Sequence, residues 1–396
     1  MNSIRFNCLC RALLLPVLLL EFSANAQSLV VSNAAPAAVP RRASIILVVA
    51  DGLGYGDLSC YGQTNFQTPN LDKLAAEGVR FTNYQAGDAA VSPARAALML
   101  GKDSGHLRQR ADADIPLAAD ETTVAQMLQQ AGYHTGLIGE WNLGGEDSSG
   151  APWKTGFDEF AGYLDANDAE NFYADYIFRY TPNSSYDKTS GKWIDWTPGQ
   201  GPPTGGREMI YANTQGKNQY IPDLLTKAAL NFIQTSQPDK FNRYRPFFLL
   251  LNYKIPGDGK SQVPTDAPFS EEPWPQPAKN KAAMIARLDG YIGQLTGQLQ
   301  KLGMTNNAAI FFTSATVPQK TGAVDPNFFH SIVSTNDLRV PMIVHWPDQI
   351  PAGAVSDFKW SARDFLPTAA EIAFAKPPEG GTGTSVLPAL LEPSKK

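Results

Sequence analysis

The acidic side chains best placed for chemistry each follow an apolar run that is typical of a buried strand. Asp51 follows one such run and Glu140 another, while Tyr253 and Ala315 end two more. Ligands of open α/β sheets bind at the carboxyl ends of the strands, so we expect any site to lie around these positions. Ester hydrolysis there would require acidic and basic side chains to converge. The candidates for that role are Asp51, Glu140, Asp258 and His330.

One serine near the start of an expected helix is a candidate nucleophile. Ser92 precedes Pro93, and no Asp/His pair that could activate its hydroxyl is evident in the sequence. Serine is also common at helix starts, and proline is tolerated in the first helical turn. We therefore expect Ser92 to begin a helix and not to act as a nucleophile.

The elements that would position these residues alternate between strands and helices. Apolar runs predict buried strands at Ser44–Ala50, Phe81–Ala86, His134–Gly139, Pro246–Tyr253, Asn307–Ala315 and Val340–Trp346. Helical spacing and end signals predict helices at Pro69–Gly78, from about Ser92, and at Glu121–Gln130, Ile221–Ile233, Ala278–Leu302 and Arg363–Phe374. This alternation predicts an α/β fold with a mostly parallel central sheet flanked by helices. Residues 181–216, rich in Pro, Gly, Ser and Thr, are expected to form a surface excursion.

The N-terminal segment has the three parts of a secretory signal peptide. Arg5 and Arg11 precede a short apolar stretch, and Ala24-Asn25-Ala26 matches an A-x-A cleavage site. We expect residues 1–26 to be a signal peptide, 27–43 a flexible leader, 44–391 one α/β domain and 392–396 a tail. The apolar stretch is too short to span a bilayer, so an exported protein, periplasmic or secreted, is expected.

Charge and cysteine content exclude some functions. The chain has 396 residues and a net charge of −5, and no Lys/Arg cluster is dense enough to predict a nucleic-acid ligand. No later segment predicts a membrane span. Of three cysteines, Cys8 and Cys10 would leave with the signal peptide. Cys60 would remain without an internal partner, so stability is expected to come from the hydrophobic core.

The run VSPARAALMLGK, from Val91 to Lys102, resembles the signature of the sulfatase family, in which a Cys-x-Pro-Ser-Arg core opens a helix. Other family landmarks follow in order over about Ser44–Leu391, including ADGLGYG, GLIGEWNLGG, PFFLLLNYKIP and RVPMIVHWP. The resemblance implies the alkaline-phosphatase-like fold of sulfatases and descent from sulfuric ester hydrolases. It also implies Ca²⁺ as the cofactor and a formylglycine nucleophile made from the signature cysteine. The C-terminal part is expected to be shorter than in many relatives.

Several positions depart from the family pattern. Val91 stands where the family has its cysteine, and valine offers no atom that could become a nucleophile. Glu140 and Asn142 replace the Lys and His of the family's Gly-Lys-Trp-His motif, and Gly257 replaces a further His. Only Arg95 is kept in this set. These residues are therefore expected to be vestigial, with no catalytic role.

The metal ligands implied by the resemblance are also reduced. The family's Asp-Asp pair appears as Asp51-Gly52, and its Ser-Asp-Asn motif appears as Ser314-Ala315-Thr316. Ca²⁺ takes six to eight oxygen ligands, and here one carboxylate of four family ligands remains. We therefore expect no bound cofactor and a purely structural Asp51.

Replacing lysine by Glu140 also changes the charge of the expected site. Two like charges about 4 Å apart repel by roughly 4 kcal/mol at an effective dielectric constant of about 20, which disfavours sulfate there. We expect Glu140 to form an ion pair with Arg95, filling the site, and Arg95 itself to pair with Asp51 or another carboxylate.

Three functions follow from these patterns. The first is an inactive sulfatase-family protein that binds a sulfated or other glycan, or a protein partner. A glycan platform could come from Phe172, Tyr173, Tyr176, Trp193 and Trp196, although these aromatics are more typical of a core. The second is an active sulfatase- or phosphatase-type ester hydrolase with a rebuilt site. The third is an unrelated exported binding protein. The oligomeric state is not predicted.

Overall fold

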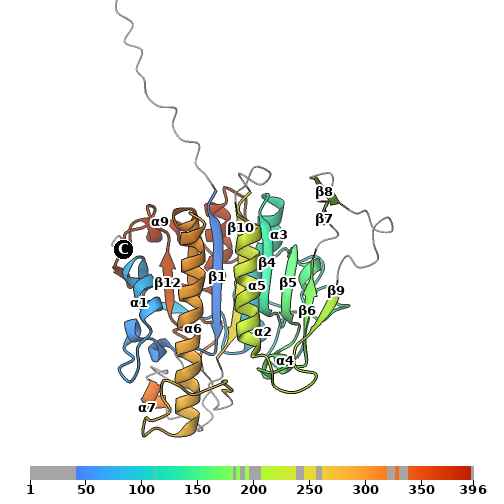
Figure 1. Ribbon diagram of the computed structural model, residues 1–396. Coiled ribbons are helices and arrows are strands. Elements are labelled where there is room, and N and C mark those ends of the chain that lie inside the picture. The colour runs from blue at the N-terminus through green and yellow to red at the C-terminus, as the bar shows by residue number, and fades with distance from the viewer. Residues whose placement is uncertain are drawn as a thin grey trace, which may run out of the picture. The chain divides into compact units, whose positions relative to one another are not determined.

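A ten-stranded sheet forms the centre of the protein (Figure 1). The computed structural model describes residues 42–111, 113–181, 184–187, 192–195, 207–237, 245–255, 261–318, 326–329 and 338–393. The expected signal peptide, nearly all of the leader, and Gly257, Asp258 and His330 lie outside these ranges. The described residues belong to one unit, Arg41–Lys396.

The strand order of the sheet is β13-β2-β12-β11-β1-β10-β4-β5-β6-β9. In this order the strands are Ala354–Ser356, Val79–Phe81, Met342–His345, Ala308–Thr313, Ser44–Asp51, Phe247–Lys254, His134–Glu140, Glu159–Tyr163, Tyr176–Tyr180 and Arg207–Tyr211. The central strands β11, β1, β10, β4 and β5 are all parallel, whereas β12 and β6 pair antiparallel at the flanks. Two further pairs lie outside this sheet: β3 (Tyr84–Gln85) with β14 (Trp360–Ser361), and β7 (Ser184–Asp187) with β8 (Lys192–Asp195).

Helices cover both faces of the sheet, as a parallel sheet requires. The helices are α1 Pro69–Ala76, α2 Val91–Leu100, α3 Val124–Gln130, α4 Ala166–Ala169, α5 Ile221–Thr235, α6 Gln276–Lys301, α7 Pro326–Phe329, α8 Phe365–Ile372 and α9 Leu387–Leu391. Side chains of β1 point alternately to two hydrophobic clusters: Ile45 and Leu47 pack with α2, α3 and α8, while Ile46 and Val48 pack with α1, α5 and α6. The predicted α/β fold with a mostly parallel centre is thus confirmed.

Some predicted elements have different boundaries. The strand predicted at Phe81–Ala86 is divided into β2 and β3. The helix predicted from Glu121 begins at Val124, because Thr123 and Gln126 form a reciprocal capping box. The predicted excursion 181–216 contains β9, which pairs with β6 at the edge of the main sheet, so it is not wholly a surface loop. No helix in the described ranges is both long and apolar enough to cross a membrane.

Candidate functional site at the carboxyl edge of the sheet

Parallel pairing brings the ends of three strands to one edge. Asp51 ends β1, and its register partner in β10 is Lys254. Glu140 ends β4, one residue beyond the pairing of Gly139 with Asn252 of β10. The three strands β1, β10 and β4 run in the same direction, so Asp51, Lys254 and Glu140 meet at one edge of the sheet. This was predicted for the two acids. Lys254 was not predicted as a site residue, although it directly follows the strand that Tyr253 was taken to end.

Helix α2 carries Arg95 to this edge. The helix begins at Val91, with Ala90 as the residue before its first turn, and residues 93–100 are all buried. Ser92 lies in the first turn, as predicted, but it does not cap the helix. Its Oγ donates a hydrogen bond to the carbonyl oxygen of Asn142 at 3.3 Å. Ser92 is therefore engaged with the backbone, and the described residues offer it no activating histidine.

Arg95 lies between the two acids. Its Nη2 is 2.8 Å from Asp51 Oδ2, and its Nη1 is 2.9 Å from Glu140 Oε1. Nη1 also donates to the carbonyl oxygen of Trp141 at 3.0 Å. The predicted ion pair between Glu140 and Arg95 is present, and so is the pair with Asp51. Burial by itself would lower the pKa of Arg95, but the two carboxylates outweigh it and raise that pKa, so the guanidinium stays charged.

The cluster is balanced in charge and shielded from water. The side chains of Asp51, Arg95 and Glu140 are 1%, 4% and 2% exposed. Lys254 Nζ lies 3.7 Å from Glu140 Oε2 and supplies the second positive charge. Neither Glu140 oxygen has a well-aligned hydrogen bond within the described part of the chain. Glu140 is therefore held mainly by charge. Asn252, also not predicted, fixes the backbone by donating from Nδ2 to the Glu140 carbonyl at 2.7 Å.

The residues at the expected metal position do not fit a calcium ion. Asp51 Oδ2 is taken by Arg95, and its Oδ1 accepts a hydrogen bond from Thr316 Oγ1 at 2.6 Å. Gly52 has φ +86°, and a Cβ placed there would lie 2.4 Å from the carbonyl oxygen of Ile255. A second aspartate therefore cannot be accommodated without moving the backbone. Ala315 is buried and contributes only a methyl group. The described residues contain no group of three or more His, Cys, Asp or Glu that could hold a metal.

The remaining predicted positions are distributed as follows. Val91 is partly buried at the start of α2. Asn142 adopts a positive φ of 58° just beyond β4, and its N–H donates to the Leu164 carbonyl.

Among the aromatic residues predicted as a glycan platform, Phe172 is 2% exposed and belongs to the core. Tyr173 is partly exposed, with Lys217 Nζ 5.2 Å from its ring centroid. The side chains of Trp193 and Trp196 lie outside the described residues.

Comparisons with known proteins agree with this architecture. The sulfatase family model matches residues 43–374. N-acetylgalactosamine-6-sulfatase of Sus scrofa is 30% identical over 379 residues, covering 89% of this chain and 67% of that protein. N-acetylgalactosamine-6-O-sulfatase of Bacteroides thetaiotaomicron is 28% identical over 377 residues, covering 78% of this chain and 68% of that protein. A crystal structure of Ps i-CgsB in complex with k-i-k-neocarrahexaose has a TM-score of 0.69 at 28% identity, covering 89% of this chain and 77% of that one. The chain belongs to the sulfatase family.

Proposed function

We propose that this sulfatase-family protein does not hydrolyse sulfate esters and acts instead as a binding protein. One observation carries the proposal: Arg95 lies between Asp51 and Glu140, at 2.8 and 2.9 Å, in the position where chemistry was expected. Both terminal nitrogens of its guanidinium are committed to internal carboxylates, so an anion would have to compete with them. The absent groups agree with this, since Val91 replaces the nucleophilic cysteine and Gly52 and Ala315 replace metal ligands.

The charge balance of the cluster also disfavours sulfate. Two cations, Arg95 and Lys254, face two carboxylates, Asp51 and Glu140, so the cluster has no net positive charge to attract an anion. A sulfate brought close would have to displace an existing ion pair. Breaking a buried pair costs about 3–5 kcal/mol, which a sulfate bound to the same cations would have to recover. We accordingly infer that the protein carries no calcium and that Asp51 is structural.

The ligand is proposed from the names of relatives. Two relatives are named for a sulfated sugar, and the structure of Ps i-CgsB contains an oligosaccharide. We infer that this protein contacts a sulfated or other glycan outside the filled cluster, or a protein partner. We also propose that the protein is exported, that residues 1–26 are removed and that residues 27–43 form a leader. This part of the proposal rests on the N-terminal sequence pattern.

An active ester hydrolase is the second candidate, and two observations favour it. Relatives about 30% identical are named as sulfatases, and Asp51 and Glu140 do converge, as a rebuilt site would need. In that case Asp51 would be essential.

The test is an activity assay on the purified mature protein with a chromogenic aryl sulfate and an N-acetylgalactosamine-6-sulfate oligosaccharide. We expect no sulfate release above buffer, because loss of one member of a catalytic unit already lowers rates by roughly 10⁴- to 10⁶-fold. Calorimetric titration with Ca²⁺ should show no binding below millimolar concentration. Sulfate release that is lost in a folded Asp51→Ala variant would establish the hydrolase instead.

A further inference from the structure

A cavity of ≈ 290 Å³ opens away from the carboxyl edge, between α5 and the outer strands of the sheet. Its apolar lining comes from Ile138 of β4, Ile177 of β6, Ile210 of β9, and Leu224 and Ala228 of α5. The volume is at the lower end of small-molecule pockets, about 300–1,000 Å³, which are also mostly apolar with a few polar groups. The cavity therefore has the size and lining for a small apolar body.

One end of the cavity is acidic. Glu159 lines it and is the register partner of Gly136 in β4. Glu140 lies four residues further along β4, about 13 Å at the usual rise of a strand. The cavity is thus separate from the Arg95 cluster, and the inference does not depend on the proposed function.

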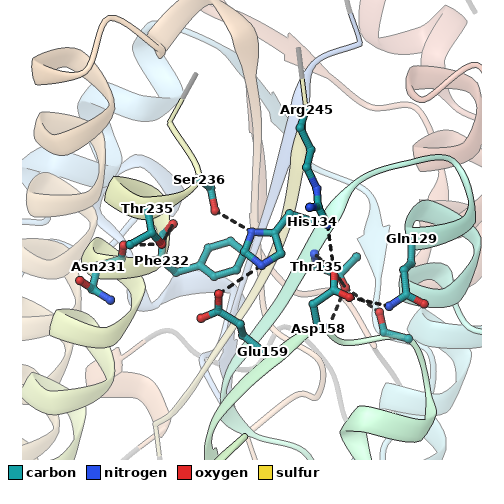
Figure 2. Close-up of polar contacts among 11 residues, drawn as sticks. Gln129, His134, Thr135, Asp158, Glu159, Asn231, Phe232, Thr235, Ser236 and Arg245 are labelled. Carbon is teal, nitrogen blue, oxygen red and sulfur yellow. Dashed lines mark hydrogen bonds and ion pairs between the residues drawn. The ribbon is translucent and has the colours of Figure 1, made fainter. Parts of the chain in front are cut away.

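The Glu159 carboxylate is held in place from behind (Figure 2). His134 Nε2 lies 3.1 Å from Glu159 Oε1, and His134 Nδ1 lies 3.0 Å from Ser236 Oγ. The His134 ring stacks on Phe232, with centroids 4.8 Å apart. The imidazole is therefore fixed on three sides, and it orients one carboxylate oxygen of Glu159, which lines the cavity.

Ser236, His134 and Glu159 have the composition of a Ser-His-acid triad, but they cannot act as one. Ser236 is 1% exposed and does not line the cavity, so a substrate cannot reach its Oγ. The arrangement positions Glu159 and does not activate a nucleophile.

The polar side chains that line the cavity include one acidic group, Glu159, together with Tyr180, Thr181 and Asn231. Within the described ranges Glu159 Oε2 has no hydrogen-bond donor. An ionised carboxylate accepts only, and its bonds to a cation are about twice as strong as neutral ones. Arg179 also lines the cavity, but it has an interaction partner of its own. A ligand with a cationic donor and an apolar tail would complement the Glu159 carboxylate and the apolar lining of the cavity.

We propose that this cavity binds a small primary alkylamine, with the ammonium group on Glu159 and the apolar tail between α5 and Ile177 and Ile210. The ammonium donates to Glu159 Oε2. The tail removes apolar surface of both partners from water.

The test is calorimetric titration of the full mature chain with hexylamine, and with hexanoate and hexanol as probes of equal tail length. We expect hexylamine to bind more tightly than either. Glu159→Gln should weaken it by roughly ten- to a hundredfold, since it loses a charged hydrogen bond. Glu272→Gln removes the same charge at an exposed site outside the cavity and should leave binding unchanged.

A second variant keeps the proposal testable if Glu159→Gln disturbs folding. Ala228→Phe fills the apolar part of the cavity without touching its acidic end, and it should weaken hexylamine and hexanol alike. Hexanoate binding as tightly as hexylamine, or unchanged hexylamine affinity in folded Glu159→Gln, would overturn the proposal.

Discussion

Two glutamates near opposite ends of β4, Glu140 in β4 itself and Glu159 in the neighbouring β5, have different surroundings. At the carboxyl end, Glu140 is 2% exposed and lies against Arg95 and Lys254. Beside the amino end, Glu159 is 29% exposed and has one histidine partner. A buried carboxylate must be neutralised internally, whereas a partly exposed one can keep an oxygen available. The comparison shows a buried acid neutralised by internal cations at the carboxyl edge and a partly exposed acid near the opposite edge.

The largest effect is expected from removing the central cation of the carboxyl edge. Arg95→Met leaves Asp51 and Glu140 buried without their shared partner and should lower the free energy of unfolding by about 3–5 kcal/mol. Urea denaturation measures this loss. Arg108→Met, which breaks the exposed pair with Asp120, is the matched control and should cause no measurable change. If the two substitutions lowered the free energy of unfolding equally, the buried charges would contribute no more to stability than the exposed ones.

Restoring the family's second aspartate should also destabilise the protein. Gly52→Asp places a side chain at φ +86°, where strain costs about 1–3 kcal/mol, and its Cβ must also displace the Ile255 carbonyl. Gly62→Asp tests strain alone, because Gly62 has φ +106° with no atom within 4 Å of an added Cβ. Denaturation midpoints should therefore fall further for Gly52→Asp. A Gly52→Asp protein as stable as Gly62→Asp would mean that the turn after β1 can move freely.

The same conservative substitution at the two glutamates tests the comparison directly. Glu140→Gln leaves Lys254 unpaired and weakens the hold on Arg95, so we expect a loss of about 1.5–3 kcal/mol. Glu159→Gln should cost less than about 1 kcal/mol, because its carboxylate is partly solvated. Chemical denaturation of both variants at one pH gives the difference. A larger loss of stability in Glu159→Gln than in Glu140→Gln would mean that Glu159, and not Glu140, is the acid on which the fold depends.

The smallest effect concerns pH. His345 ends β12, and burial lowers its pKa below the ordinary 6.5. The unfolded chain then takes up a proton before the folded one does, so stability is full above pH 6.5 and falls below it, by at most about 1.4 kcal/mol per pH unit. Denaturation at pH 7.5 and 5.5 measures this, and His345→Leu should flatten the dependence. An unchanged slope in that variant would assign the acid sensitivity to other groups.

Sequence patterns predicted much of the carboxyl edge because each element there has a local signal. Apolar runs located β1, β4 and β10, and parallel pairing then required Asp51 and Glu140 to meet. The resemblance identified Arg95 as a cation kept from the family pattern and placed Glu140 at the position of the family's lysine, and their opposite charges then predicted the ion pair. Gly52 was recognised as a lost ligand, but its positive φ and the nearby Ile255 carbonyl depend on how two strand ends pack.

The acidic cavity could not be predicted in the same way. Glu159 and His134 come from β5 and β4, Ser236 directly follows α5, and no motif links the three. Their proximity depends on the register of Gly136 with Glu159 and on the packing of α5 over β4. Likewise β9 was hidden in a segment whose composition is typical of a loop. These features arise from tertiary pairing, which spacing along one chain does not encode.

The turn at Gly52 limits how the family's second aspartate could be introduced into this chain. A carboxylate at this position becomes tolerable only after the chain following β10 has shifted the Ile255 carbonyl, so that change must come first. Until then, a cysteine introduced at position 91 would have only Asp51 nearby of the metal ligands that the resemblance implies. Laboratory evolution toward sulfate hydrolysis should therefore start with the segment after Lys254, because substitutions in the signature helix have no benefit alone.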